Sequence, residues 1–145
     1  MAVNIEALTG VDEEIVEAFD RLLPQLSQSA ERLDREALAR LVSAESTTVL
    51  VARSGGRIVG TLTLVMFRLP SGLRARIEDV VVDTGARGQG IGAALTTEAM
   101  TRATDAGART VDLTSRASRV AANRLYERLG FQSRESQVYR YSPHH

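Results

Sequence analysis

The sequence predicts a single-domain α/β fold over residues 1–145, with a mixed sheet of six or seven strands and about four helices. Three observations support this prediction. Amphipathic helical periods alternate with β-rich runs along the chain, and no linker, repeat or low-complexity segment interrupts them. The β-rich runs of the N-terminal half follow one another through short turns, which predicts antiparallel pairing. One helical period separates the runs at 75–83 and 109–115, which predicts a β-α-β crossover.

The first elements are a short strand and two helices. Residues 3–8 alternate apolar and polar side chains, which predicts the strand. From Asp12 the apolar residues recur at helical spacing, and Pro24 is expected to kink or end this first helix. A second helix is predicted over 34–44, with Asp34 as its N-cap because a carboxylate there accepts from the free N–H groups of the first turn.

The next elements are three β-rich runs separated by turns. The segment SGGR at 54–57 lies between the first two, and a Gly-Gly pair in that position indicates a hairpin. A second turn, PSG at 70–72, leads into the run ARIEDVVVD at 75–83. We therefore expect these runs to form the antiparallel half of the sheet.

The C-terminal half continues with a helix that follows Gly92 and ends at Gly107, where glycine is a natural C-cap. Residues 109–115 are expected to form a buried strand, and 118–129 a helix. Residues 131–141 are expected to supply one or two final strands.

Composition excludes several classes of function. Acidic and basic residues balance at 18 each, so the net charge indicates neither nucleic acid nor an anionic membrane as a partner. All of the basic residues are arginine, which excludes Schiff-base and P-loop lysines, and the absence of cysteine excludes a thiolate nucleophile. We expect no metal site. No signal peptide or membrane-spanning stretch is recognisable, so we expect a cytoplasmic protein.

The glycines at alternating positions in RGQGIG, residues 87–92, lie where a predicted strand gives way to a predicted helix. Glycine allows a sharp bend there, and free N–H groups at a helix start favour phosphate oxygens. The segment is therefore either a pyrophosphate site or a strand-to-helix turn that binds nothing. GQGIGA also matches a dinucleotide fingerprint, with Asp112 downstream, but its first glycine follows the strand too late, and the fingerprint starts mid-chain, which leaves too little sequence for a doubly wound sheet. A P-loop is excluded because no GK[ST] follows.

Two segments together resemble the GCN5-related N-acetyltransferase (GNAT) superfamily. Arg87-Gly88-Gln89-Gly90-Ile91-Gly92 is similar to the acetyl-CoA signature R/Q-x-x-G-x-G/A, and NRLYERLGF at 123–131 is similar to a second signature, LYxxLGF. The resemblance implies a GNAT-type sheet whose strands 75–83 and 109–115 splay apart, and acetyl-CoA as co-substrate. It implies cofactor contacts from the following residues: Val80, Val81, Val82, Arg87, Gly88, Gln89, Gly90, Ile91, Gly92 and Asn123.

The resemblance also implies catalytic residues. Tyr126 aligns with the family's tyrosine and would protonate the departing thiolate. A carboxylate at the position of Glu78 would deprotonate the incoming amine directly or through a water, with Asp79 as the alternative. Alternation along a strand places Glu78 on the face of Val80 and Val82, and Asp79 on the opposite face with Val81.

One position departs from the family pattern. Many members carry asparagine seven residues before the tyrosine, where this chain has Arg119, and Asn123 follows one turn later. Either residue is a candidate cofactor contact.

The sequence thus predicts an N-acetyltransferase that moves the acetyl group of acetyl-CoA to a primary amine, by direct attack in a ternary complex. The acceptor is a small-molecule amine or a peptide amine, with neither nucleic acid nor membrane as partner. Oligomers are common in the family, so a homodimer is an option. The alternative is a non-catalytic acyl-CoA-binding or sensing module.

Overall fold

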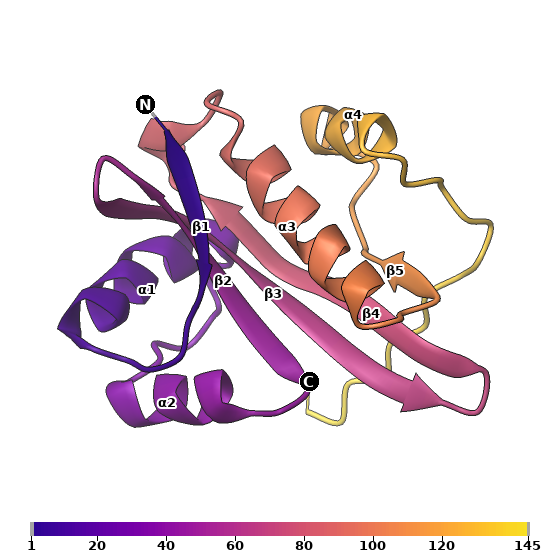
Figure 1. The fold of residues 1–145 in the computed structure, drawn as a ribbon, viewed down its shortest axis with the longest axis horizontal. Coiled ribbons are helices and arrows are strands. Elements are labelled where there is room, and N and C mark those ends of the chain that lie inside the picture. Colours follow the sequence, from indigo (N-terminus) through magenta and orange to yellow (C-terminus); the bar gives the residue numbers. More distant parts are fainter. Residues whose placement is uncertain (1, 145) are drawn as a thin grey trace. The chain divides into compact units, whose positions relative to one another are not determined.

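One mixed sheet organises the first of two structural units, residues 1–114 (Figure 1). The computed structural model describes residues 2–144. In chain order, the elements of this unit are β1 (Val3–Ala7), α1 (Glu13–Leu26), α2 (Arg35–Ser43), β2 (Thr47–Ser54), β3 (Arg57–Leu69), β4 (Gly72–Val82), the 3-10 turn η1 (Thr84–Ala86), α3 (Ile91–Asp105) and β5 (Thr110–Asp112).

The sheet has the order β1-β2-β3-β4-β5, so neighbours in sequence are neighbours in space. The first four strands pair antiparallel, and β4 pairs parallel with β5. Helix α3 connects these two parallel strands. The predicted antiparallel N-terminal half and the predicted crossover are therefore confirmed.

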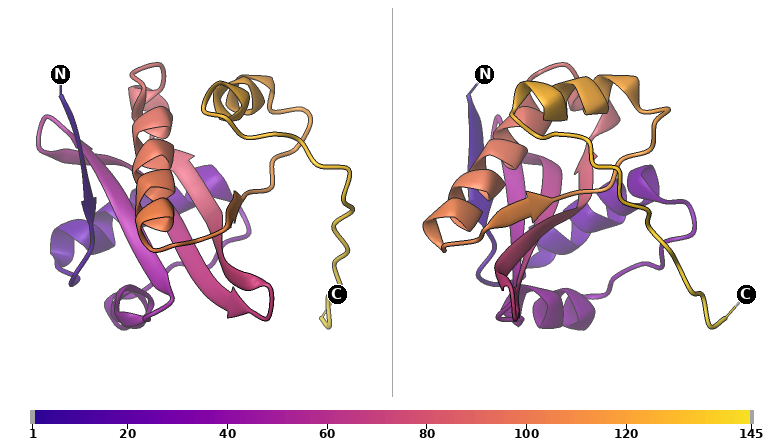
Figure 2. Two further views of the ribbon diagram at one scale, coloured as in Figure 1. Left: turned by 45° about the vertical axis from the view of Figure 1, so that its right-hand side comes forward. Right: turned by 90° about the vertical axis from the view of Figure 1, so that its right-hand side faces the viewer.

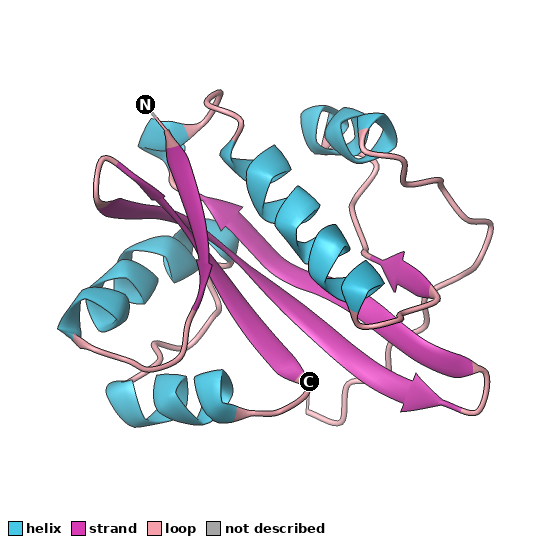
Figure 3. Cartoon of the chain, viewed as in Figure 1, coloured by secondary structure: helices cyan, strands magenta, loops and turns pink. Residues whose placement is uncertain are grey.

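The second unit, residues 115–145, contains α4 (Val120–Arg128) and an extended segment after it (Figure 3). Residues 131–141 form no strand, so the described chain has five strands and the prediction of six or seven is wrong. Tyr139 and Tyr141 alternate as in a strand, but they are 90% and 87% exposed. A strand also needs a neighbour for its backbone hydrogen bonds, and alternation carries no information about that partner.

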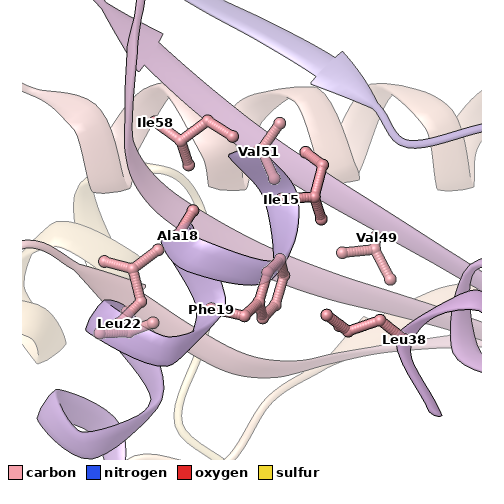
Figure 4. Packing of buried hydrophobic residues seen from close by; sticks show 9 residues of the cluster. Ile15, Ala18, Phe19, Leu22, Leu38, Val49, Val51 and Ile58 are labelled. Atoms are coloured by element: carbon pink, nitrogen blue, oxygen red, sulfur yellow. The ribbon is translucent and has the colours of Figure 1, made fainter. Parts of the chain in front are cut away.

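Helices α1 and α2 cover one face of the sheet, and α3 covers the other (Figure 2). The face under α1 and α2 holds an apolar core, shown in Figure 4. Its buried members are Ile15, Ala18, Phe19, Leu22, Leu38, Val49, Val51, Ile58 and Val81. Apolar residues at helical spacing on α1 thus meet alternate residues of β2, which is why this segment of the sequence folds as a helix on a sheet.

Aspartates cap both N-terminal helices. The Asp12 carboxylate accepts from the Ile15 N–H at 3.0 Å, and the Asp34 carboxylate accepts from the Ala37 N–H at 2.8 Å, as predicted for Asp34. Pro24 does not end α1 at once, because the helix includes it and continues to Leu26. Proline there affects only the last turn.

Helix α3 packs closely on the sheet at Gly60 of β3. A Cβ at this position would lie 3.1 Å from Ile91 Cγ2 and 3.2 Å from both Leu95 Cδ1 and the Val81 carbonyl oxygen. We expect Gly60→Ala to lower the free energy of unfolding by about 1–3 kcal/mol, since overpacking forces shifts in a dense core. Urea denaturation measures this change. Gly10→Ala is the control, because no atom lies within 4 Å of the added methyl group, and an equal loss in both variants would contradict the prediction.

Candidate functional site

The edge of β4 that faces β5 is paired along only part of its length. β5 pairs with residues 74–76 of β4 and ends at Asp112, whereas β4 continues to Val82. The Asp83 N–H donates to the Val59 carbonyl on β3 at 2.8 Å. Because successive residues of a strand direct their backbone groups to opposite edges, the N–H and C=O of Val82 face the edge that β5 has left. The two parallel strands therefore part, and β4 leaves backbone hydrogen-bonding groups without a strand neighbour in this unit.

A β-bulge interrupts β4 at Asp79. Glu78 pairs with Thr63 and Val81 pairs with Thr61, so three residues of β4 span the distance that two residues of β3 span. Asp79 has φ +50°, the only positive φ of a non-glycine residue among residues 2–144. The expectation that Glu78 shares a face with Val80 and Val82 is wrong, because the bulge breaks the alternation and puts Glu78 on the face of Val81.

That face is the one under α1 and α2, because Val81 belongs to the core that these helices cover. The Glu78 carboxylate itself is exposed to solvent. Its Oε2 lies 3.4 Å from Nε of Arg76, whose Nη2 donates to Thr114 Oγ1 at 3.0 Å. The neighbouring Asp79 side chain is also exposed and makes no hydrogen bond or ion pair with any described residue.

The glycine segment forms the turn between η1 and α3. Gly88 has φ +83° and Gly90 has φ +76°, conformations that residues with a Cβ rarely adopt. Gly90 occupies the N-cap position of α3, so no side chain caps this helix. A Cβ at either glycine would meet no atom within 4 Å. The glycines are thus required by the backbone conformation, and the space beside them is open.

A row of unpaired N–H groups lines this turn. The first helical hydrogen bond of α3 runs from the Ala94 N–H to the Gly90 carbonyl at 3.0 Å. The N–H groups of residues 88–93 have no acceptor within the described chain. The Arg87 side chain beside them is exposed and forms no ion pair with the described residues. Free N–H groups, the positive end of the helix dipole and an arginine together favour an anion, and phosphate groups fit best.

Ile91 and Gly92, at the start of α3, offer a ligand only their backbone groups. The Ile91 side chain is 1% exposed and packs on the sheet at Gly60, so only its backbone is free for a ligand. The Gly92 carbonyl accepts from the Thr96 hydroxyl at 2.7 Å inside α3. Gln89 is exposed at the tip of the turn.

In the second unit, α4 carries Tyr126, whose side chain is 9% exposed. Its ring packs edge-on against Phe131, with 5.9 Å between ring centroids and 68° between ring planes. Burial raises the pKa of the Tyr126 phenol above its ordinary value, and the charge of Arg119 offsets part of this effect. The phenol therefore keeps its proton at neutral pH, as a proton donor must.

Asn123 and Arg119, the two candidate cofactor contacts at α4, differ in their hydrogen bonds. The Asn123 amide nitrogen donates to the Arg116 carbonyl at 3.0 Å, which ties α4 to the loop before it. Arg119 is the N-cap residue of α4 and its side chain makes no hydrogen bond to the described residues. One of the two amide N–H donors of Asn123 is thus engaged, whereas the guanidinium of Arg119 makes no hydrogen bond to the described residues.

The structure brings the predicted residues of β4 and of the glycine turn onto one continuous segment of the first unit. Tyr126 and Asn123 belong to the second unit. Sequence reasoning missed two polar residues of α1, Arg21 and Gln25, which hydrogen-bond to the end of β4. No local signal identifies them, because their partners are 62 and 58 residues away.

No described helix has both the length and the apolar composition that crossing a membrane requires. No cluster of three or more metal-ligating side chains is found among residues 2–144 either.

Comparisons of the sequence and of the fold with known proteins both find acetyltransferases. The sequence model of the acetyltransferase (GNAT) family matches residues 12–131. No curated protein matches the sequence at a significant level. An aminoglycoside acetyltransferase from an uncultured soil metagenomic sample is 26% identical, with a TM-score of 0.85 over 99% of this chain and 97% of that one. A transcriptional regulator from Bacillus halodurans C-125 is 27% identical, with a TM-score of 0.81 over 97% and 100%. AAC(6')-Iy, in complex with a bisubstrate analog containing CoA, is 16% identical with a TM-score of 0.79 over 98% and 99%, a likeness in fold alone.

Proposed function

We propose that this chain, which belongs to the acetyltransferase (GNAT) family, is an N-acetyltransferase that uses acetyl-CoA and acts as one domain over residues 1–145. The observation that carries the proposal is the row of unpaired N–H groups at residues 88–93. These groups, with Arg87 beside them, suit the pyrophosphate of CoA. Gln89 and the backbone of Ile91 and Gly92 complete the proposed binding turn.

The open edge of β4 is the proposed site for the pantetheine arm. This arm contains amides, which pair with free backbone groups as a strand would. Val82 supports this assignment, since its backbone faces the edge that β5 leaves. Val80 is the second proposed contact, whereas the Val81 carbonyl lies beside Gly60 on the β3 side and is the weaker of the three.

The proposed reaction is direct attack of a primary amine on the acetyl group. The amine nitrogen gives its proton to Glu78, directly or through a water, and forms a bond to the carbonyl carbon. A backbone N–H of β4 stabilises the negative charge that develops on the carbonyl oxygen. The C–S bond then breaks, and Tyr126 donates its proton to the departing thiolate. The products are the acetylated amine and CoA.

The acceptor class is proposed from chemistry and from one relative. The metagenomic neighbour is named an aminoglycoside acetyltransferase, so amines of amino sugars are the first candidates for this chain. Peptide amines are the second. The exposed Glu78 on the face of α1 and α2 supports an acceptor that approaches from that face, with a cationic amine drawn to the carboxylate.

Release of free CoA thiol from acetyl-CoA tests the proposal. We expect turnover above hydrolysis with at least one member of a panel that contains an aminoglycoside, a polyamine and peptides with a free N-terminus. CoA binding by calorimetry without turnover on any amine would instead support the acyl-CoA-binding module. Heat stabilisation by NAD but not by CoA would overturn the assignment of the glycine turn.

Glu78→Gln is expected to lower kcat about 10²-fold at neutral pH, because general-base catalysis contributes on that order. The effect should diminish as the pH rises and the free amine becomes abundant. Steady-state kinetics over a pH range measures it. Asp79→Asn is the matched control one residue away, and a larger loss in that variant would transfer the role of base to Asp79.

A further inference from the structure

The end of β4, directly before the glycine turn, is held by two polar residues of α1. Arg21 Nη1 donates to the Asp83 carboxylate at 2.8 Å and to the Ile58 carbonyl at 3.1 Å. Gln25, one turn further along α1, donates from Nε2 to the other oxygen of Asp83 at 3.3 Å. One guanidinium and one amide thus hold both oxygens of the same carboxylate.

Gln25 also holds the first residue of η1. Its Oε1 accepts from both the backbone N–H and the hydroxyl of Thr84, each at 2.9 Å. The Ala86 N–H in turn donates to the Asp83 carbonyl at 2.8 Å. The helix therefore fixes the backbone at the point where the chain leaves the sheet, a few residues before Gly88.

This network is largely shielded from solvent. The side chains of Arg21 and Asp83 are 21% and 18% exposed. Burial acts to raise the pKa of the Asp83 carboxyl, but the hydrogen bonds from Gln25, Arg21 and the Gly85 backbone together with the charge of Arg21 outweigh burial, so the pKa is lowered. The carboxylate therefore stays charged at neutral pH and holds both partners. Such shielded, charge-assisted bonds are more rigid than exposed ion pairs.

We infer that Arg21 and Gln25 are positioning residues for the cofactor turn: they hold Asp83 and Thr84 so that the N–H groups of residues 88–93 converge on one anion. The inference rests on the proposed function. The chain between Ala86 and α3 has few hydrogen bonds of its own to fix its position. The one from the Arg87 N–H to the Thr84 carbonyl is 3.5 Å long. The position of the turn is then set by its anchor at the end of β4.

Gln25→Ala tests the inference, because it removes the contacts to Asp83 and Thr84 without leaving a buried charge. We expect the Kd for CoA to rise about tenfold, because the three hydrogen bonds from Gln25 to Asp83 and Thr84 are lost but act on the bound anion only through the turn. Activity should fall with acetyl-CoA at subsaturating concentration but not with acetyl-pantetheine, which lacks the pyrophosphate. A purely structural role would reduce turnover of both donors equally.

Arg21→Lys is the second variant. A lysine keeps a positive charge beside the Asp83 carboxylate but cannot also donate to the Ile58 carbonyl in the same geometry. A smaller rise in Kd is expected than for Gln25→Ala. Arg32→Ala is the control, because Arg32 follows α1, hydrogen-bonds to Asp20 of that helix at 2.8 Å and makes no hydrogen bond to a described residue of the turn. If the unsubstituted protein binds no CoA, the proposed function fails. If it binds CoA and Gln25→Ala binds as tightly, the inference fails.

Discussion

Tyr126→Phe is expected to lower kcat about 10²-fold while the KM for acetyl-CoA changes little, since general-acid catalysis contributes on that order. The substitution removes only the hydroxyl group. The ring keeps its edge-on contact with Phe131, so α4 should retain its structure. Steady-state kinetics with acetyl-CoA and the best amine of the panel measures the effect.

The pH dependence gives a second measure of the same role. Burial raises the pKa of Tyr126, with partial offset from Arg119, so the proton is lost only above the ordinary tyrosine value of about 10. We expect the alkaline decrease of kcat to lie above that pH, and to be absent in Tyr126→Phe. Tyr139→Phe is the control, because this side chain is 90% exposed. Equal kcat values for Tyr126→Phe and the unsubstituted protein would exclude the acid role.

Gly90→Ala is expected to weaken CoA binding by about 10- to 100-fold. An alanine in the left-handed conformation costs about 1–2 kcal/mol, equivalent to about 5- to 30-fold, and a shift to negative φ would weaken binding further because it turns the N–H groups of the turn away from the anion. Steric exclusion inside the protein is not the cause, because no atom lies within 4 Å of the added methyl group. Calorimetric titration with CoA measures the change.

Gly85→Ala is the matched control for this prediction. Gly85 lies in η1, its φ is not positive, and a methyl group there also meets no atom within 4 Å. Its Kd for CoA should stay within about twofold, since a substitution without strain or contact has little effect. Comparable weakening in both variants would show that any side chain in this segment is harmful, and the role of the left-handed turn would be refuted.

Much of the first unit was predictable from sequence because its signals are local. The spacing of apolar residues indicates α1 and α2, Asp34 marks the start of α2, and the glycines of RGQGIG indicate the turn into α3. Each of these features depends on residues within one or two helical turns of each other. The antiparallel order of β2, β3 and β4 followed from the short turns between them.

The second unit was harder to predict. The helix expected over 118–129 is present as α4, but the strands expected over 131–141 are absent from the described chain. Strand 109–115 is likewise reduced to Thr110–Asp112. The length of a strand depends on how far its neighbour stays within hydrogen-bonding distance, and the sequence of the strand itself does not specify that.

By itself, the sequence determined the order of elements as far as α4, the position of the glycine turn and the kind of anion that such a turn can bind. Only the tertiary structure decided which way Glu78 faces, because the bulge at Asp79 arises from the register of β4 against β3. It also decided that Arg21 and Gln25 anchor the turn, since they and Asp83 are brought together by the packing of α1 on the sheet. The physical reason is the same in both cases: local backbone preferences act over a few residues, whereas register and packing join residues that are far apart in the chain.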